Sequence, residues 1–246
     1  MHLPEFIKDY FDDRQELFDE IKTLEKSIGI RLFKRLLNDN NEINFYSWLT
    51  EVRFGLYFDK ISSELKHEEL IDDKTPDWTF IKNNQKILVE VARLNPNEKE
   101  FLQRIKLENS ISKILREHPD AQVGTIPSIG GPKWSSAEYF GNAKSKLAKK
   151  EKDYRDIIES HKIPFIICIA PSSDTNIMPL NVFEFLIGNV RSGFFYTDKD
   201  FGKNVTGVLL RPFIRMNEIY FHNENAENKL NAVNEEFFEG ISYKGD

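Results

Sequence analysis

The sequence predicts an α/β protein with a mixed central sheet, and three stretches of the chain support that prediction. Residues 75–94 contain strand-forming residues on both sides of a polar segment at 82–85, which is typical of two strands joined by a tight turn. Residues 143–160 have the spacing of a charged amphipathic helix, and residues 163–171 form an apolar run bounded by prolines. Such a run is typical of a strand buried on both faces. Because a helix that leads into a buried strand implies a crossover connection, we expect a parallel or mixed sheet.

The composition is that of an ordinary globular protein of one large or two small domains. The 246 residues carry a formal net charge of −6, which argues against nucleic-acid binding over the whole surface but allows a local basic groove. No apolar run approaches the ~20 residues of a membrane span, and the acidic amino terminus lacks the core of a signal peptide. The single cysteine, Cys168, lies in an apolar run and is expected to be a core residue. We therefore expect a cytoplasmic protein without an internal disulfide.

The first 42 residues are expected to form an N-terminal helical extension. Apolar residues recur at helical spacing over 5–37, with an interruption at Gly29 and a short helix from Ile30 to Leu37. This extension is interpreted as a cover for the core, with a dimerisation element as the alternative. The next predicted helix, 43–60, has an apolar face that flanks Glu51, and a first strand is expected within 61–71, around 69–71.

The hairpin at Thr75–Leu94 is the candidate site. Alternation along its second strand places Leu88, Glu90 and Ala92 on one face. A carboxylate in the middle of an apolar strand is costly if it is buried alone, so we expect a compensating group near Glu90. A divalent metal shared with a second carboxylate is one option, and Asp77 on the neighbouring strand is placed to supply it.

The pair Pro76-Asp77 followed by Glu90 resembles the active-site hairpin of the PD-(D/E)XK nucleases, the restriction-endonuclease-like superfamily. The resemblance implies an α-β-β-β-α-β core with a mixed central sheet, and Mg²⁺-dependent hydrolysis of DNA phosphodiester bonds. In that superfamily a glutamate on the helix before the sheet often joins the metal site, and Glu51 matches it in order and context. The lysine expected two residues after Glu90 is replaced by Ala92.

A lysine on the following helix is the expected replacement. Some nucleases of this superfamily carry the lysine on that helix, a few residues before an aromatic residue, and Lys150 with Tyr154 resembles their arrangement. Helical spacing places Lys150 on the inner face or at its edge, since it follows Leu147 by three residues. Lys146 is the second candidate, and the alternative is a solvated basic face without a catalytic role.

The resemblance therefore implies a site in which Asp77, Glu90 and Glu51 bind Mg²⁺ or Mn²⁺ and Lys150 takes part in catalysis. Hard oxygen ligands suit these ions rather than Zn²⁺. The expected partner is DNA, and a two-fold homodimer would suit the cutting of both strands of a duplex. Because Ala92 departs from the motif, the alternative function is a catalytically inactive nuclease-fold protein that binds nucleic acid or protein.

The remaining expectations concern domain organisation. Residues 43–232 are interpreted as one nuclease-like α/β domain with a helix–loop insertion at 97–142, and residues 233–246 as a C-terminal tail. Within the last part of the domain, we expect an apolar helix at 180–190 and a hairpin-like segment at 194–200. Two extra C-terminal strands, at 206–212 and 218–222, are expected to extend the sheet.

Overall fold

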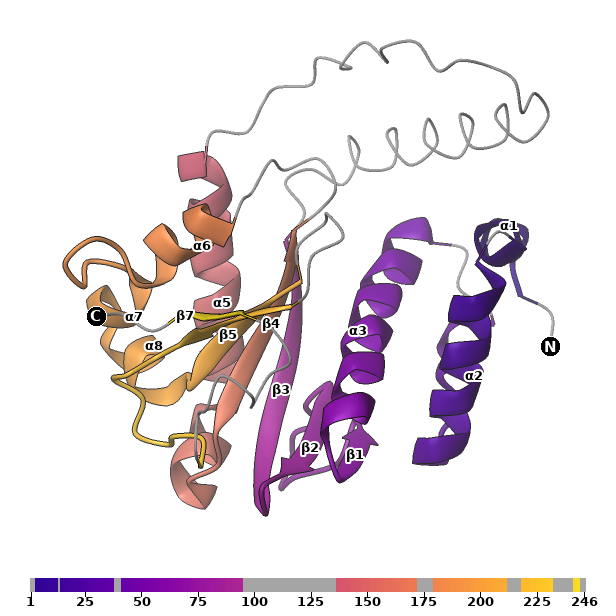
Figure 1. Ribbon diagram of the computed structural model, residues 1–246, viewed down its shortest axis with the longest axis horizontal. Coiled ribbons are helices and arrows are strands. Elements are labelled where there is room, and N and C mark those ends of the chain that lie inside the picture. The colour runs from indigo at the N-terminus through magenta and orange to yellow at the C-terminus, as the bar shows by residue number, and fades with distance from the viewer. Residues whose placement is uncertain are drawn as a thin grey trace, which may run out of the picture.

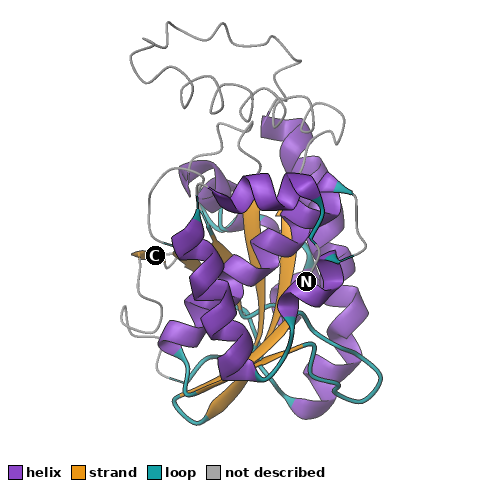
Figure 2. Cartoon of the chain, turned by 90° about the vertical axis from the view of Figure 1, so that its right-hand side faces the viewer, coloured by secondary structure: helices purple, strands orange, loops and turns teal. Residues whose placement is uncertain are grey.

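The fold is a central sheet with helices on both faces (Figure 1). The computed structural model describes residues 3–12, 14–37, 41–94, 136–171, 179–211, 218–231 and 241–243. The helices α1, α2 and α3 lie on one side of the sheet, and α5 to α8 lie on the other (Figure 1). Viewed from the side of α1 and α2, helices cross in front of the strands (Figure 2). The expected α/β class with a mixed sheet is confirmed.

The helices and strands have the following bounds. The helices are α1 (Glu5–Asp12), α2 (Gln15–Ile28), the 3-10 helix η1 (Leu32–Leu36), α3 (Glu42–Ile61), α5 (Ser136–His161), α6 (Pro179–Leu186), α7 (Phe194–Thr197) and α8 (Lys199–Asn204). The strands are β1 (Glu64–His67), β2 (Trp78–Lys82), β3 (Gln85–Leu94), β4 (Phe165–Pro171), β5 (Gly207–Leu210), β6 (Ile219–His222) and β7 (Ile241–Tyr243).

The described strands form one seven-stranded sheet in which spatial order follows chain order, from β1 to β7. The pairs β1–β2, β2–β3 and β5–β6 are antiparallel, whereas β3–β4, β4–β5 and β6–β7 are parallel. Between the parallel strands β3 and β4 the described chain includes α5, which packs on both strands. The two extra strands expected near the C-terminus are confirmed as β5 and β6, and β7 lies within the predicted tail.

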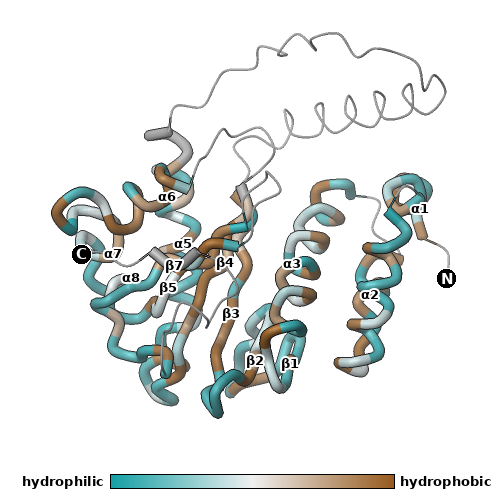
Figure 3. Tube along the Cα trace, in the orientation of Figure 1, coloured by the Kyte–Doolittle hydropathy of each residue, from teal (hydrophilic) through white to brown (hydrophobic). Residues whose placement is uncertain are grey.

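Strand β3 divides the interior into two apolar cores, because successive side chains of a strand point to opposite faces. Ile87 and Val89 belong to the core beneath α1, α2 and α3. Leu88, Ala92 and Leu94 belong to the core beneath α5 to α8. Apolar residues are concentrated along β3 and β4 in Figure 3. Glu90 therefore projects from β3 on the α5 side of the sheet, as does Ala92.

The N-terminal region forms separate helices rather than one continuous helix. Helix α1 ends at Asp12 and α2 begins at Gln15. The predicted interruption at Gly29 is where α2 ends: Gly29 has a left-handed φ of 71°, and its N–H donates to the carbonyl of Glu25. A 3-10 helix then occupies Leu32–Leu36, within the predicted short helix.

Three local predictions were wrong. The first strand is β1 at Glu64–His67, which lies within the predicted range 61–71 but before the expected position at 69–71, because ELKH contains only one aliphatic side chain and so gives little strand signal. The segment 194–200 forms α7 and the start of α8 rather than a hairpin, since the Asp198 carboxylate caps α8 by accepting from the N–H of Phe201. Helix α5 begins at Ser136, so the predicted helix–loop insertion ends before residue 142. The rest of that insertion, 97–135, lies outside the described residues.

Candidate active site

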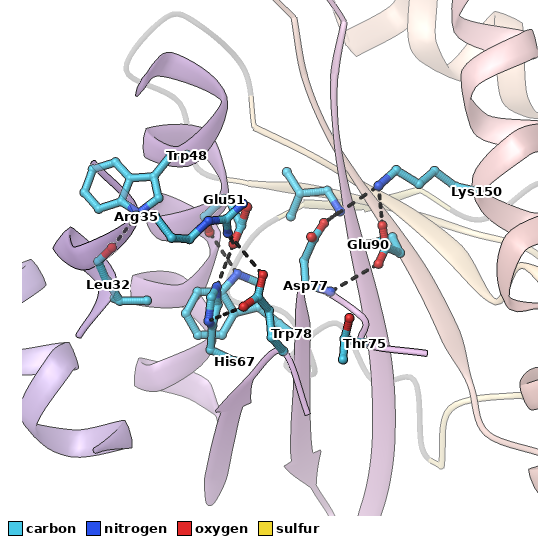
Figure 4. Close-up of polar contacts among 12 residues, drawn as sticks. Leu32, Arg35, Trp48, Glu51, His67, Thr75, Asp77, Trp78, Glu90 and Lys150 are labelled. Carbon is cyan, nitrogen blue, oxygen red and sulfur yellow. Dashed lines mark hydrogen bonds and ion pairs between the residues drawn. The ribbon is translucent and has the colours of Figure 1, made fainter. Parts of the chain in front are cut away.

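The hairpin of β2 and β3 brings two carboxylates together. Asp77 immediately precedes β2, and the antiparallel register that pairs Trp78 with Val89 places Asp77 beside Glu90. The backbone N–H of Asp77 donates to Glu90 Oε1 at 3.1 Å, and the N–H of Val91 donates to Asp77 Oδ2 at 2.7 Å (Figure 4). Each acidic side chain is thus held by the backbone of the strand that carries the other.

Lys150 reaches this pair from helix α5. Its Nζ donates to Glu90 Oε2 and lies 4.0 Å from Asp77 Oδ2 (Figure 4). The helix is anchored one turn later, where the hydroxyl of Tyr154 donates to the carbonyl of Thr75 at 2.9 Å. The structure therefore brings together Asp77, Glu90 and Lys150 from three separate segments of the chain.

The electrostatics of the site reflect burial together with neighbouring carboxylates. Burial, with the carboxylates of Glu90 and Glu51, raises the pKa of Asp77 to about 8, although Lys150 and the Val91 N–H act to lower it. Burial alone would lower the pKa of Lys150, but Glu90 and Asp77 outweigh burial and raise it above its usual value. Burial and the nearby carboxylate of Glu90 also raise the pKa of Tyr154. Lys150 is therefore a firmly charged ammonium beside carboxylates that it only partly neutralises.

Ala92 stands where the motif lysine was expected. It is 5 % exposed and belongs to the apolar core that also contains Leu147 of α5. Lys146, the second candidate for a moved lysine, is exposed, and its Nζ donates to the carbonyl of Arg93 at 3.4 Å. Of the two candidate lysines, Lys150 is therefore the one that lies at the carboxylates of Asp77 and Glu90.

Glu51 is not in contact with the other predicted site residues. Its buried carboxylate binds Arg35 Nη1 at 2.9 Å and His67 Nε2 at 2.6 Å. Its backbone carbonyl accepts from Trp78 Nε1 at 2.9 Å, which ties α3 to the residue that follows Asp77. In Figure 4 this group lies on the α3 side of Asp77, away from Lys150. Glu51 acts on Asp77 through its charge rather than through a contact.

A second polar group surrounds Glu51. One ligand atom from each of Glu51, His67 and Glu68 lies within 4.8 Å of the others, a spacing that could hold a metal ion. Arg35 Nη1 is 2.9 Å from Glu51 and 3.3 Å from Glu68, so a guanidinium already supplies positive charge there. The imidazole of His67 also packs edge-on against Trp78, with ring centroids 4.6 Å apart.

Sequence reasoning missed Arg35, His67 and Thr75. Arg35 and His67 each lie 16 residues from Glu51 and meet it only through the packing of η1 and β1 around α3. No local motif links positions that far apart. Thr75 contributes only its backbone carbonyl, which any residue type could supply, so the residue type at this position does not indicate the contact.

Comparison of the chain with protein-family models, curated proteins and solved structures gave no match. Of the helices that the structure describes, none combines the length and the apolar character that crossing a membrane requires.

Proposed function

We propose that the chain is a metal-dependent nuclease of the PD-(D/E)XK, restriction-endonuclease-like type, which hydrolyses DNA phosphodiester bonds. The observation that carries the proposal is the convergence of Asp77, Glu90 and Lys150, with Lys150 Nζ in contact with Glu90 and 4.0 Å from Asp77. The order α3, β1, β2, β3, α5, β4 among the described elements supports an α-β-β-β-α-β core.

The carboxylates are suited to Mg²⁺ or Mn²⁺. Asp77 and Glu90 offer hard oxygen atoms, and a cation between them would favour the charged form of Asp77, whose pKa burial and the neighbouring carboxylates raise. Asp77 and Glu90 would hold the ion, whereas Glu51, which is bound to Arg35 and His67, would add negative charge from a distance. A bound divalent ion would lower the pKa of a coordinated water and would neutralise negative charge on the phosphate.

Lys150 supplies the ammonium that Ala92 does not. Because its pKa is raised, Lys150 stays protonated and can donate to a phosphate oxygen or orient the attacking water. Tyr154 holds helix α5 over the hairpin through the carbonyl of Thr75, two residues before Asp77. The absence of the motif lysine at position 92 therefore does not imply that the protein is inactive.

The test is cleavage of circular, linear and single-stranded DNA, and of RNA, with Mg²⁺ or Mn²⁺ and with EDTA. The variants are Asp77→Asn, Glu90→Gln and Lys150→Gln, and the control is Lys149→Gln, an exposed lysine on the same helix. We expect each site variant to lose about 100-fold or more in rate, because each removes a charged group from the reacting centre. Lys149→Gln should cleave like the parent.

Metal-dependent cleavage that survives in Asp77→Asn or Glu90→Gln would contradict the assignment of that carboxylate. A Lys150→Gln variant of parental activity would exclude Lys150 and turn attention to Lys146. No cleavage by the parent, together with no Mg²⁺ or Mn²⁺ binding by calorimetry, would favour the inactive nuclease-fold protein instead.

A further inference from the structure

An imidazole and two carboxylates meet between α3 and the end of β1. Glu51 comes from α3, His67 is the last residue of β1, and Glu68 follows it in the chain. One ligand atom from each of the three lies within 4.8 Å of the others. Figure 4 shows the side chains of Glu51 and His67 pointing toward one another. Zn²⁺ sites in proteins are built from these two types of ligand, an imidazole nitrogen and carboxylate oxygens.

The backbone holds the imidazole and the second carboxylate in place. Antiparallel pairing of His67 with Trp78 fixes the end of β1, and the imidazole packs edge-on against the indole. Successive side chains of a strand point to opposite faces, but Glu68 leaves the strand with a left-handed φ of 49°. Its Oε2 lies 3.9 Å from His67 Nδ1. The N–H of Glu68 donates to the carbonyl of Asp77 at 3.2 Å, which fixes this turn.

Two of the three side chains are buried and the third opens to solvent. Glu51 is 7 % exposed and His67 is 5 % exposed, whereas the side chain of Glu68 is 47 % exposed. A buried carboxylate and a buried imidazole both need partners, because the loss of water is otherwise uncompensated. An ion held here would be shielded on the side of the sheet. It could take a water molecule on the side of Glu68, as zinc sites with three protein ligands do.

Arg35 is a cation that competes for these carboxylates. Its Nη1 lies 2.9 Å from Glu51 Oε1 and 3.3 Å from Glu68 Oε1. Among the described side chains of this group, one guanidinium therefore faces two carboxylates, and a divalent ion in its place would balance both. The Arg35 side chain is 49 % exposed, so it can turn to solvent without opening an apolar core.

We propose that Glu51, His67 and Glu68 form a binding site for Zn²⁺, separate from the carboxylates of the hairpin, and that Arg35 competes with the ion for the two glutamates. An imidazole nitrogen favours Zn²⁺ over Mg²⁺, which prefers oxygen ligands. The site does not depend on the proposed nuclease activity, because its ligands are not those of the hairpin. The ion would join α3 to β1 and so would stabilise the folded chain.

The experiment is calorimetric titration of Zn²⁺ into the full chain after treatment with a chelator, with Mg²⁺ as the comparison ion. Glu68→Gln is the main test variant, because this exposed position can change without disturbing an apolar core. Arg35→Gln removes the competing cation. The controls are Glu64→Gln, an exposed carboxylate on β1, and His161→Gln, an exposed imidazole that pairs with Asp72. Circular dichroism checks that each variant is folded.

The two test variants should change the affinity in opposite directions. Loss of an outer partner of a metal ligand typically lowers metal affinity by about 10–100-fold, and loss of a ligand should cost at least as much. We therefore expect the affinity for Zn²⁺ to fall about 100-fold in Glu68→Gln. In Arg35→Gln it should rise by about fivefold, the equivalent of one surface ion pair. Both controls should bind Zn²⁺ like the parent, and Mg²⁺ should not displace it.

The double variant Asp77→Asn/Glu90→Gln separates this site from the hairpin. Zn²⁺ binding that survives in the double variant supports the proposal, and its loss there would overturn it. Parental affinity in Glu68→Gln, loss of binding in His161→Gln, or a parent that binds no Zn²⁺ would also overturn it. An affinity that falls in Arg35→Gln would refute the competition. Cleavage of DNA tests only the hairpin carboxylates, so the nuclease and the Zn²⁺ site can fail separately.

Discussion

Gly55 is the position at which one methyl group should disturb both the fold and the candidate site. It lies in α3 directly over Trp78, which is fully buried and follows Asp77 in the chain. A Cβ added at Gly55 would lie 2.5 Å from Trp78 Cη2 and 2.8 Å from Cε2, well inside van der Waals contact. Since carbon atoms pack at about 3.5–4.0 Å, the indole ring or the helix must move by more than 1 Å.

The expected cost follows from two opposing effects. Overpacking of a well-filled core costs about 1–3 kcal/mol. Replacing a helical glycine by alanine returns about 1 kcal/mol, because the unfolded chain loses conformational freedom. We therefore expect Gly55→Ala to lower the free energy of unfolding by up to about 2 kcal/mol, which corresponds to a fall of up to roughly 8 °C in Tm for a chain of this size. Movement of the indole would also strain the bond from Trp78 Nε1 to the carbonyl of Glu51 and shift Asp77.

Urea unfolding followed by circular dichroism measures the difference, and Gly141→Ala is the matched control. Gly141 is also helical, in α5, but a Cβ added there meets no atom within 4 Å. The control should therefore be stabilised by up to about 1 kcal/mol. The reasoning would be refuted if Gly55→Ala were as stable as Gly141→Ala, because the close approach of α3 to β2 would then carry no energetic consequence.

Three further predictions follow from buried polar groups. In EDTA, Asp77 should keep its proton up to about pH 8 in the folded chain but only up to about pH 4 in the unfolded chain. The parent should therefore lose stability relative to Asp77→Asn as the pH rises from about 4 to about 8. Urea midpoints of the two proteins that run parallel over this pH range would contradict the prediction. Asn223→Ala should cost about 2 kcal/mol in urea unfolding, because the amide of Asn223 donates to the buried carbonyls of Gly202 and Val205. Cys168 is buried and burial raises its pKa, so thiol reagents should label it only as fast as the chain unfolds.

The parts of the fold with long apolar patterns could be predicted from sequence. Helix α3, the hairpin and β4 follow from periodicity because their buried faces are continuous along the chain. Strand β1 could not be predicted from sequence, because its pairing with β2 uses backbone groups and only Leu65 and His67 point inward. Short helices such as α7 depend on tertiary contacts and on one capping residue, so their sequences carry little periodicity.

The pairing of Asp77 with Glu90 was predictable from the turn. Asn83 and Asn84 both have positive φ, 52° and 58°, as a two-residue hairpin turn requires. Once the turn is placed there, counting outward along two antiparallel strands puts Asp77 opposite Glu90. The neighbours of Glu51 were not predictable in this way, since His67 and Arg35 reach it from separate elements whose spacing depends on how the helices pack.

The presence of alanine at position 92 and of a lysine at position 150 on α5 connects the proposed chemistry with the packing of the sheet. Both residues lie on the α5 side of β3, but Ala92 is enclosed by the apolar core, where an ammonium would be poorly solvated. Lys150 lies farther out and remains one-third exposed, so its charge meets Glu90 without entering that core. Its position then depends on how α5 is seated, through the buried Leu147 before it and the bond from Tyr154 to Thr75 after it. In this chain the ammonium at the carboxylates is therefore held by the crossover helix, and loosening that helix should misplace it even where the hairpin is intact.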